Sequence, residues 1–218
     1  MSQHTLTLLR FTYKKLKEKL TVSDSKKLFY EQFPYVIPGL YKRIVDEMLV
    51  ELNLLNHQNE FTQDCLFCVG LTETFEELMK GYKPEKHLDL LFESLCSCTN
   101  FDAKEIKETS KKTQKNFNDK SSKDILKLLI ENNNPNLYPS RILNLGIYII
   151  ISSSVDLAEK KETEKNKIIS DILEKLNLSI NKAEKDIGIY KSSISKMEQA
   201  KELIQELRIK DKNKNQKQ

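Results

Sequence analysis

Apolar side chains recur at intervals of three and four residues along most of this chain, and few residues between them would interrupt a helix. The pattern is clearest in residues 40–55, where one stripe of a helix would hold Tyr41, Ile44, Val45, Met48, Leu52 and Leu55. Only five Gly and five Pro occur among the 218 residues, while 31% of residues are charged. Such a composition favours long helices with solvated outer faces. The sequence therefore predicts an all-α, multi-helix bundle without a sheet.

Capping residues and chain breakers set the expected bounds of the helices. Ser23 or Asp24 begins a helix that ends near Gln32, and a turn rich in Pro then interrupts the chain. Further helices are expected over residues 40–55, 62–81, 84–96, 102–117, 125–130, 141–157, 163–176 and 179–212. The Ile-rich run within 141–157 would also suit a strand by periodicity alone, but the helical segments on both sides favour a buried helix.

We expect four segments along the chain. Residues 1–20 form a basic amphipathic N-terminal extension, residues 21–178 a helical domain, residues 179–212 a long C-terminal helix, and residues 213–218 a polar tail. The extension suits either a solvated, poorly ordered terminus or an anchor on a membrane surface. The long helix is expected to project in part, or to be coiled-coil-like, because it carries a two-helix contact pattern: Ile187, Tyr190, Ile194, Met197, Ala200, Ile204 and Leu207.

Charge and hydropathy argue against several classes of protein. The net charge is +4, and Lys and Glu are interleaved, which makes a weak electrostatic surface for nucleic acid. The best candidate for a membrane span, residues 142–151, has about half of the ~20 residues that a transmembrane helix needs. No signal peptide is recognisable at the N-terminus. Four Cys without an export signal suggest free thiols in a reducing compartment.

The residues that most often bind metals or catalyse reactions do not occur at the required spacings. Cys65-x-x-Cys68 is expected in the middle of a helix, and Cys96-x-Cys98 has only one residue between its thiols. Buried, inert thiols fit these apolar settings better than zinc, whose ligands converge from turns. The three His lack the spacing of a helical metal site, and no phosphate-binding loop or nucleophile motif occurs. We therefore expect no enzymatic activity, no metal and no cofactor.

A series of short blocks follows in one order from residue 21 to residue 212. The main blocks are Thr21-Val22-Ser23-Asp24-Ser25-Lys26-Lys27, Phe29-Tyr30, Tyr41-Lys42-Arg43-Ile44-Val45-Asp46-Glu47, Gly81-Tyr82-Lys83-Pro84-Glu85, Ser140-Arg141, Leu145-Gly146, Tyr190-Lys191-Ser192 and Lys196-Met197-Glu198-Gln199-Ala200. Together they resemble the thylakoid formation protein family of cyanobacteria and chloroplasts, whose members are photosystem II-associated helical proteins. The resemblance covers most of the chain without a large gap.

The resemblance implies a non-enzymatic interaction factor in thylakoid membrane biogenesis and in photosystem II assembly and repair. The partners that it implies are an FtsH-type membrane protease, photosystem II components and the surface of the thylakoid membrane. It also implies a peripheral location on the cytoplasmic side of that membrane, with a soluble pool. The residues themselves leave open an alternative, a helical lipid- or pigment-binding protein with an apolar cavity.

Three positions depart from the family's pattern. Phe33-Pro34-Tyr35-Val36 stands where the family tends to have a His-Pro-Arg-Pro-like turn, and Pro38-Gly39 stands where it has an Asn-Ser pair. Asn53, which falls off the apolar stripe of residues 40–55, replaces a His. Any function that family members assign to that His or that Arg is therefore in doubt for this chain, while the fold is not.

Arg43 and Arg141 are the candidate partner-binding residues. Only four Arg occur in a chain rich in Lys, and these two lie in blocks that match the family. A planar guanidinium supplies a bidentate fork or a stacking surface, which Lys does not. Two interpretations fit: an internal clamp on a carboxylate between helices, or a contact with a partner protein.

Overall fold

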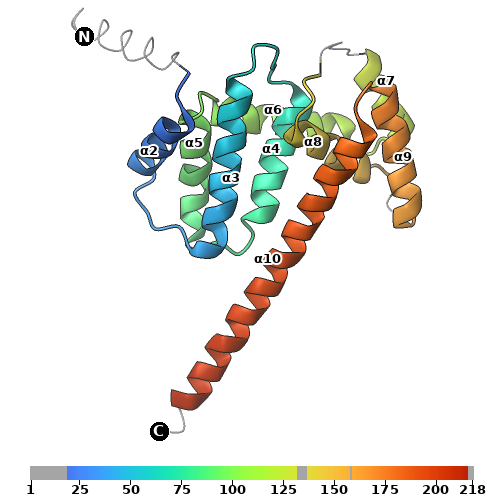
Figure 1. The fold of residues 1–218 in the computed structure, drawn as a ribbon. Coiled ribbons are helices and arrows are strands. Elements are labelled where there is room, and N and C mark those ends of the chain that lie inside the picture. The colour runs from blue at the N-terminus through green and yellow to red at the C-terminus, as the bar shows by residue number, and fades with distance from the viewer. Residues whose placement is uncertain (1–18, 132–136, 158, 216–218) are drawn as a thin grey trace, which may run out of the picture. The chain divides into compact units, whose positions relative to one another are not determined.

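The computed structural model describes residues 19–131, 137–157 and 159–215, with side chains up to residue 207. Within these ranges all of the regular secondary structure is helical and no strand occurs, which confirms the all-α prediction (Figure 1). Most of the N-terminal extension expected over residues 1–20 lies outside the described residues, as does the end of the polar tail.

Most predicted helices are present, with their ends shifted by a few residues. The elements are α2 (Val22–Gln32), α3 (Gly39–Asn56), α4 (Cys65–Leu78), the 3-10 turn η1 (Glu85–His87), α5 (Leu88–Ser97), α6 (Ala103–Phe117), α7 (Ser122–Glu131), α8 (Arg141–Ser152), α9 (Glu162–Lys175) and α10 (Ile180–Asn215). The predicted end of α8 at residue 157 is wrong. The hydroxyls of Ser153 and Ser154 bond to the carbonyls of Ile150 and Ile151, which offers the backbone an alternative to a further helical turn.

Side-chain caps fix several helix starts. The N-cap of α2 is Thr21, rather than Ser23 or Asp24, and its hydroxyl accepts a bond from the Asp24 N–H at 3.2 Å. Asp64 caps α4, and its carboxylate accepts bonds from the N–H groups of Leu66 and Phe67. Each cap satisfies N–H groups that have no partner within the helix.

The contacts divide the chain into two compact units. Unit 1 comprises residues 19–61 and 83–105, and unit 2 comprises residues 62–82 and the described residues from 106 onward. The predicted segment 21–178 contributes to both units, and α10 belongs to unit 2, while the boundary expected at residue 178 stays a prediction. The core of unit 1 is formed by side chains that are each at most 1% exposed: Phe29, Phe33, Leu49, Leu52, Phe92 and Leu95.

Asn53 holds the start of unit 1 together, although the apolar stripe placed it outside the core. The side chain is only 2% exposed, and its Nδ2 donates to the Leu20 carbonyl and to Ser25 Oγ, both at 2.8 Å. The Ser25 side chain is itself fully buried. Since buried polar groups need partners, this amide fixes where the chain enters α2.

In unit 2, α4 and α8 cross with their backbones in contact at two glycines. A Cβ on Gly70 would lie 2.0 Å from the Ile142 carbonyl oxygen, and a Cβ on Gly146 would lie 1.9 Å from the Leu66 carbonyl oxygen. Real Cβ atoms do not approach backbone so closely, so only glycine fits at either position. The pairing of α4 with α8 is thereby set by two residues without side chains.

The start of α7 is attached to the segment after α8 by Asp156. The two carboxylate oxygens of Asp156 accept bonds from the backbone N–H and the hydroxyl of Ser122, both at 2.6 Å. The Val155 N–H donates to the Lys120 carbonyl at 3.2 Å beside them. A carboxylate at this end of α7 also interacts favourably with the helix dipole.

We expect the Asp156 contact to stabilise the fold above about pH 4 and to fail in acid. Partial burial alone would raise the pKa of the Asp156 carboxyl, but its hydrogen bonds with Ser122 and Ser154 outweigh burial, and the pKa is lowered. A carboxyl with a lowered folded pKa contributes stability above its unfolded pKa of about 3.9, and this is lost as the pH falls through the folded value. Asp156→Ala should lower the free energy of unfolding by about 1 kcal/mol at pH 7. Urea unfolding at pH 7 and at pH 3 measures the free energy of unfolding of both proteins. A difference between variant and wild type that is as large at pH 3 as at pH 7 would contradict this prediction.

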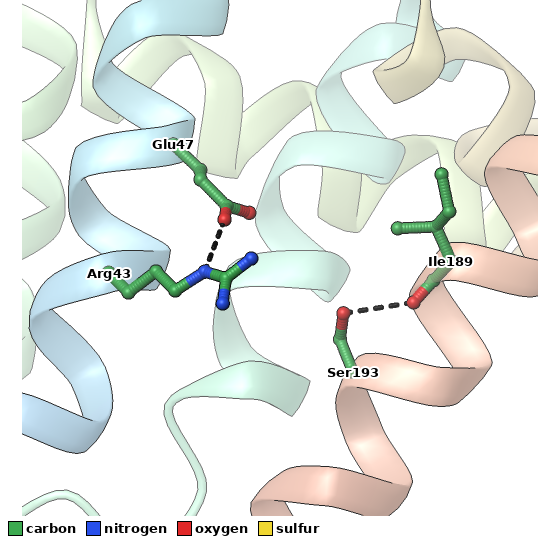
Figure 2. A network of polar contacts seen from close by, with 4 residues as sticks. All are labelled: Arg43, Glu47, Ile189 and Ser193. Atoms are coloured by element: carbon green, nitrogen blue, oxygen red, sulfur yellow. Dashed lines mark hydrogen bonds and ion pairs between the residues drawn. The ribbon is translucent and has the colours of Figure 1, made fainter.

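The last helix, α10, is packed over its first half, and most side chains over residues 198–207 of its second half are exposed. Asn144 of α8 donates to Asp186 of α10 at 2.8 Å in a buried contact, which anchors the first half. Figure 1 shows the C-terminal half of α10 extending past α4, α8 and α9, the helices of unit 2 that it contacts. Midway along, the Ser193 hydroxyl donates to the Ile189 carbonyl at 2.9 Å, within the helix (Figure 2). The predicted projection is confirmed.

Candidate interaction surface

Arg43 lies on the exposed side of α3 in unit 1. Its Nε donates to Glu47 Oε1 at 2.8 Å, one turn further along the same helix (Figure 2). The Arg43 side chain is 86% exposed. This contact lies within one helix, not between helices as the clamp interpretation expects, and exposed pairs of this kind contribute little to stability. The geometry leaves most of the guanidinium accessible to a partner.

Arg141 occupies a different setting, at the first position of α8 in unit 2. Its side chain is half-buried, and Ser140 caps the helix just before it. A cation in the first turn of a helix opposes the helix dipole, so the stability of α8 does not explain an Arg here. Arg43 and Arg141 belong to different units and are two separate candidates; a partner contact at either one stays a prediction.

The four Cys side chains are wholly or partly buried, and two of them have a raised pKa. Cys65 and Cys68 lie in the first turn of α4, so their predicted position in the middle of a helix is wrong. Cys65 is half-buried, and the other three thiols are buried. Burial raises the pKa of Cys98 to about 12, and burial together with the charge of Asp64 raises the pKa of Cys65. Such thiols stay protonated at neutral pH and are poor nucleophiles and poor metal ligands. In the part of the chain that the structure describes, no three His, Cys, Asp or Glu side chains are grouped to hold a metal ion.

A group of titratable side chains joins α8, α9 and α10 in unit 2. Lys191 of α10 pairs with Glu162 of α9, and its Nζ lies 5.0 Å from the ring centre of Tyr148 in α8. The Tyr190 ring packs edge-on against that of Tyr148, 6.4 Å between centres. Burial, followed by nearby charges, raises the pKa of Tyr190 far above its usual value. The phenol therefore stays protonated, and the group is suited to joining helices rather than to removing a proton.

The second half of α10 displays an unusual row of exposed apolar side chains. Leu203, Ile204 and Leu207 are 57%, 41% and 52% exposed. Earlier members of the same apolar rhythm, Ile187 and Met197, are 8% and 6% exposed. The exposed row is more typical of a protein-binding surface than of a solvated helix.

The glycine crossing bears on the lipid- or pigment-binding alternative. Such a protein needs an apolar cavity between its helices. In unit 2 the backbones of α4 and α8 are in direct contact at Gly70 and Gly146, so no ligand fits between these two helices.

Nearly the whole chain matches the model of one known protein family. The family model described as "Thylakoid formation protein" matches residues 21–218, which is nearly the whole chain. The chain belongs to the thylakoid formation protein family. The resemblance noted from the short sequence blocks is thereby confirmed.

Curated relatives support the same assignment. Protein Thf1 of Prochlorococcus marinus strain MIT 9312 is 81% identical over 199 residues, covering 91% of this chain and 99% of that protein. Protein Thf1 of Parasynechococcus marenigrum strain WH8102 is 34% identical over 203 residues, covering 93% and 95%. A solved structure of Psb29 superposes with a TM-score of 0.79 at 26% identity and covers 91% of this chain and 100% of that one. The helical architecture is therefore one that the family shares.

No helix in the described ranges is long and apolar enough to cross a membrane. Two exposed side chains were not anticipated from the sequence. Val36, in the turn between α2 and α3, is 90% exposed, and its neighbour Tyr35 is 45% exposed. The signal available in the sequence was a run of three apolar residues, Tyr35, Val36 and Ile37, between Pro34 and Pro38, of which only Ile37 is buried.

Proposed function

We propose that this protein is a non-enzymatic interaction factor in thylakoid membrane biogenesis and in photosystem II assembly and repair. It acts by binding or stabilising an FtsH-type membrane protease, together with photosystem II components. It does so peripherally, on the cytoplasmic side of the thylakoid membrane, with a soluble pool.

The match of the family model over residues 21–218 is the observation that carries this proposal. The site geometry supports a binding role over a catalytic one. The thiols of Cys65 and Cys98 and the phenol of Tyr190 are shifted toward their neutral forms, which is the wrong direction for a nucleophile or a base. At the same time Arg43 and the row Leu203, Ile204 and Leu207 are exposed, which suits contacts with a protein partner.

Capture of the protease from detergent-solubilised thylakoid membranes tests the proposal. Tagged full-length protein should retain the FtsH-type protease, with photosystem II subunits beside it. Absence of the protease from the retained material, with the tagged protein folded and in excess, would contradict the proposed partner.

Arg43→Lys separates a partner contact from a structural role. Because the ion pair of Arg43 with Glu47 lies along one exposed helix face, the variant should melt at the wild-type temperature. Loss of the guanidinium fork should lower protease capture by about tenfold if Arg43 lies in the contact. Lys112→Ala, which removes an exposed cation from α6, is the control and should leave capture unchanged. Equal capture by Arg43→Lys and the wild type would remove Arg43 from the partner-binding residues.

A further inference from the structure

The turn between α2 and α3 has an apolar tip that the fold of unit 1 does not use. It runs from Phe33 to Pro38 and leads into the N-terminus of α3 (Figure 1). Phe33 and Ile37 are buried and hold the turn, while Val36 keeps 90% of its surface exposed. A Val side chain so exposed protrudes from the surface and gains nothing from folding. Its apolar surface is removed from water only when something outside unit 1 covers it.

The tip is held in place by a continuous series of aromatic contacts. The Tyr35 ring is stacked on the His87 ring at 3.8 Å between centres and lies edge-on to Phe33 at 5.4 Å. Phe33 in turn stacks on the fully buried Phe29 at 5.9 Å, and Phe29 contacts Tyr30. The exposed members of this series therefore belong to a rigid surface. A rigid tip loses little conformational entropy when it binds.

The elements that flank the tip, α2, α3 and η1, each carry an exposed Lys. Lys42 Nζ lies 6.0 Å from the centre of the Tyr30 ring, and Lys27 is exposed one turn before Tyr30 on α2. Lys86 is exposed next to His87. No side chain caps the N-terminus of α3, and its first turn has no acidic residue, so the positive end of the helix dipole is uncompensated there.

The nearby carboxylates do not cancel this charge. Asp46 is paired with Lys26 at 3.1 Å, Glu47 with Arg43 at 2.8 Å, and Glu85 with Lys83. Glu31, exposed beside Tyr30, and Asp89, exposed in the first turn of α5, reduce the positive excess of Lys27, Lys42 and Lys86 without removing it. The surface thus combines a protruding aliphatic side chain, two half-exposed Tyr rings and a surplus of Lys.

We propose that this tip docks on the surface of an anionic lipid bilayer, with Val36 inserted below the headgroups and Tyr35 at their level. Tyr is enriched at membrane interfaces because its ring is apolar and its hydroxyl is polar. Lys side chains near a bilayer are attracted to anionic headgroups. A single exposed aliphatic side chain beside Tyr rings and Lys side chains matches an anionic bilayer surface better than a protein interface, where Lys is depleted. The inference rests on the proposed peripheral location and adds the surface that makes the contact.

Single-tryptophan reporters in the full-length protein test the insertion. The chain contains no Trp, so Val36→Trp and Leu54→Trp each carry one fluorophore, and Leu54 is 53% exposed on α3 as a matched control. With vesicles of phosphatidylcholine and phosphatidylglycerol, the emission of Val36→Trp should shift to shorter wavelength and be quenched by brominated lipid. The emission of Leu54→Trp should stay unchanged. Equal spectra of Val36→Trp with and without vesicles overturn the proposal.

Vesicle sedimentation provides the affinity. Val36→Ser should weaken binding to the anionic vesicles by about tenfold, and Leu54→Ser should leave it unchanged. Vesicles of phosphatidylcholine alone, or high salt, should reduce binding of the wild type, because exposed charges are screened. Equal binding by Val36→Ser and Leu54→Ser overturns the proposal. Protease capture in detergent by Val36→Ser should equal capture by the wild type. Vesicle binding therefore tests the docking tip, and protease capture separately tests the proposed protease contact.

Discussion

Substitution of Gly70 or Gly146 by alanine is expected to destabilise this protein more than other single-methyl additions. The added Cβ would sit 2.0 Å or 1.9 Å from a backbone oxygen of the facing helix, and backbone cannot rotate away as a side chain can. The α4 and α8 axes would have to separate, which would disturb the packing of unit 2 around them. We expect a loss of about 3 kcal/mol or more in the free energy of unfolding, the upper range for overpacking.

A third glycine supplies the control for this prediction. Gly188, exposed on α10, has no heavy atom within 4 Å of an added Cβ. Gly188→Ala should stabilise the protein by about 0.5–1 kcal/mol, because alanine has less freedom to lose than glycine in a helix. Urea unfolding of the three variants measures both effects. Similar midpoints for Gly70→Ala and Gly188→Ala would contradict the close crossing of α4 and α8.

Replacement of Asn53 by leucine is expected to have the next largest effect. Leucine has a similar size, but it leaves the Leu20 carbonyl and the buried Ser25 hydroxyl without the donor that Asn53 provides. Loss of these contacts should lower the free energy of unfolding by about 2 kcal/mol. Hydrogen exchange should also show faster opening of the backbone around residues 20–25, where the amide is anchored.

Leu54→Ala, at the next position of the same helix, is the matched control for Asn53→Leu. Its side chain is 53% exposed, so truncation should change the free energy of unfolding by less than about 0.5 kcal/mol. If Asn53→Leu were as stable as Leu54→Ala, the buried amide would not be the anchor that the geometry indicates.

Local sequence patterns were sufficient to predict most helices but not how they pack. Asp64 and Ser140 are short polar residues directly before apolar runs, the usual sequence signal of a helix start, and each caps its helix. Helix ends were less predictable, because at Ser153 and Ser154 side-chain bonds to the backbone compete with a further turn. Capping depends on neighbours within a few residues, and packing depends on residues far apart in the chain.

The residues that organise each unit illustrate this limit. Asn53 was placed outside the core because its helix position departs from the apolar stripe, yet its partners Leu20 and Ser25 lie some thirty residues earlier. Gly70 and Gly146 matter only as a pair, and no local pattern joins them. The same holds for the candidate site: Arg scarcity drew attention to Arg43, but its exposure could be known only from the fold.

The free half of α10 makes helix formation itself part of any binding reaction there. An α-helix rises about 1.5 Å per residue, so residues 198–215 extend roughly 27 Å, and most side chains over residues 198–207 are exposed. Isolated helices of such length are only marginally stable in water, and this segment should exchange its amide hydrogens faster than the residues near Asp186. A partner that packs on Leu203, Ile204 and Leu207 would therefore also suppress fraying. The affinity of such a partner for α10 would therefore depend on solvent-facing residues that the partner does not contact. Substitutions there that raise helix propensity should raise the affinity, and those that lower it should lower the affinity.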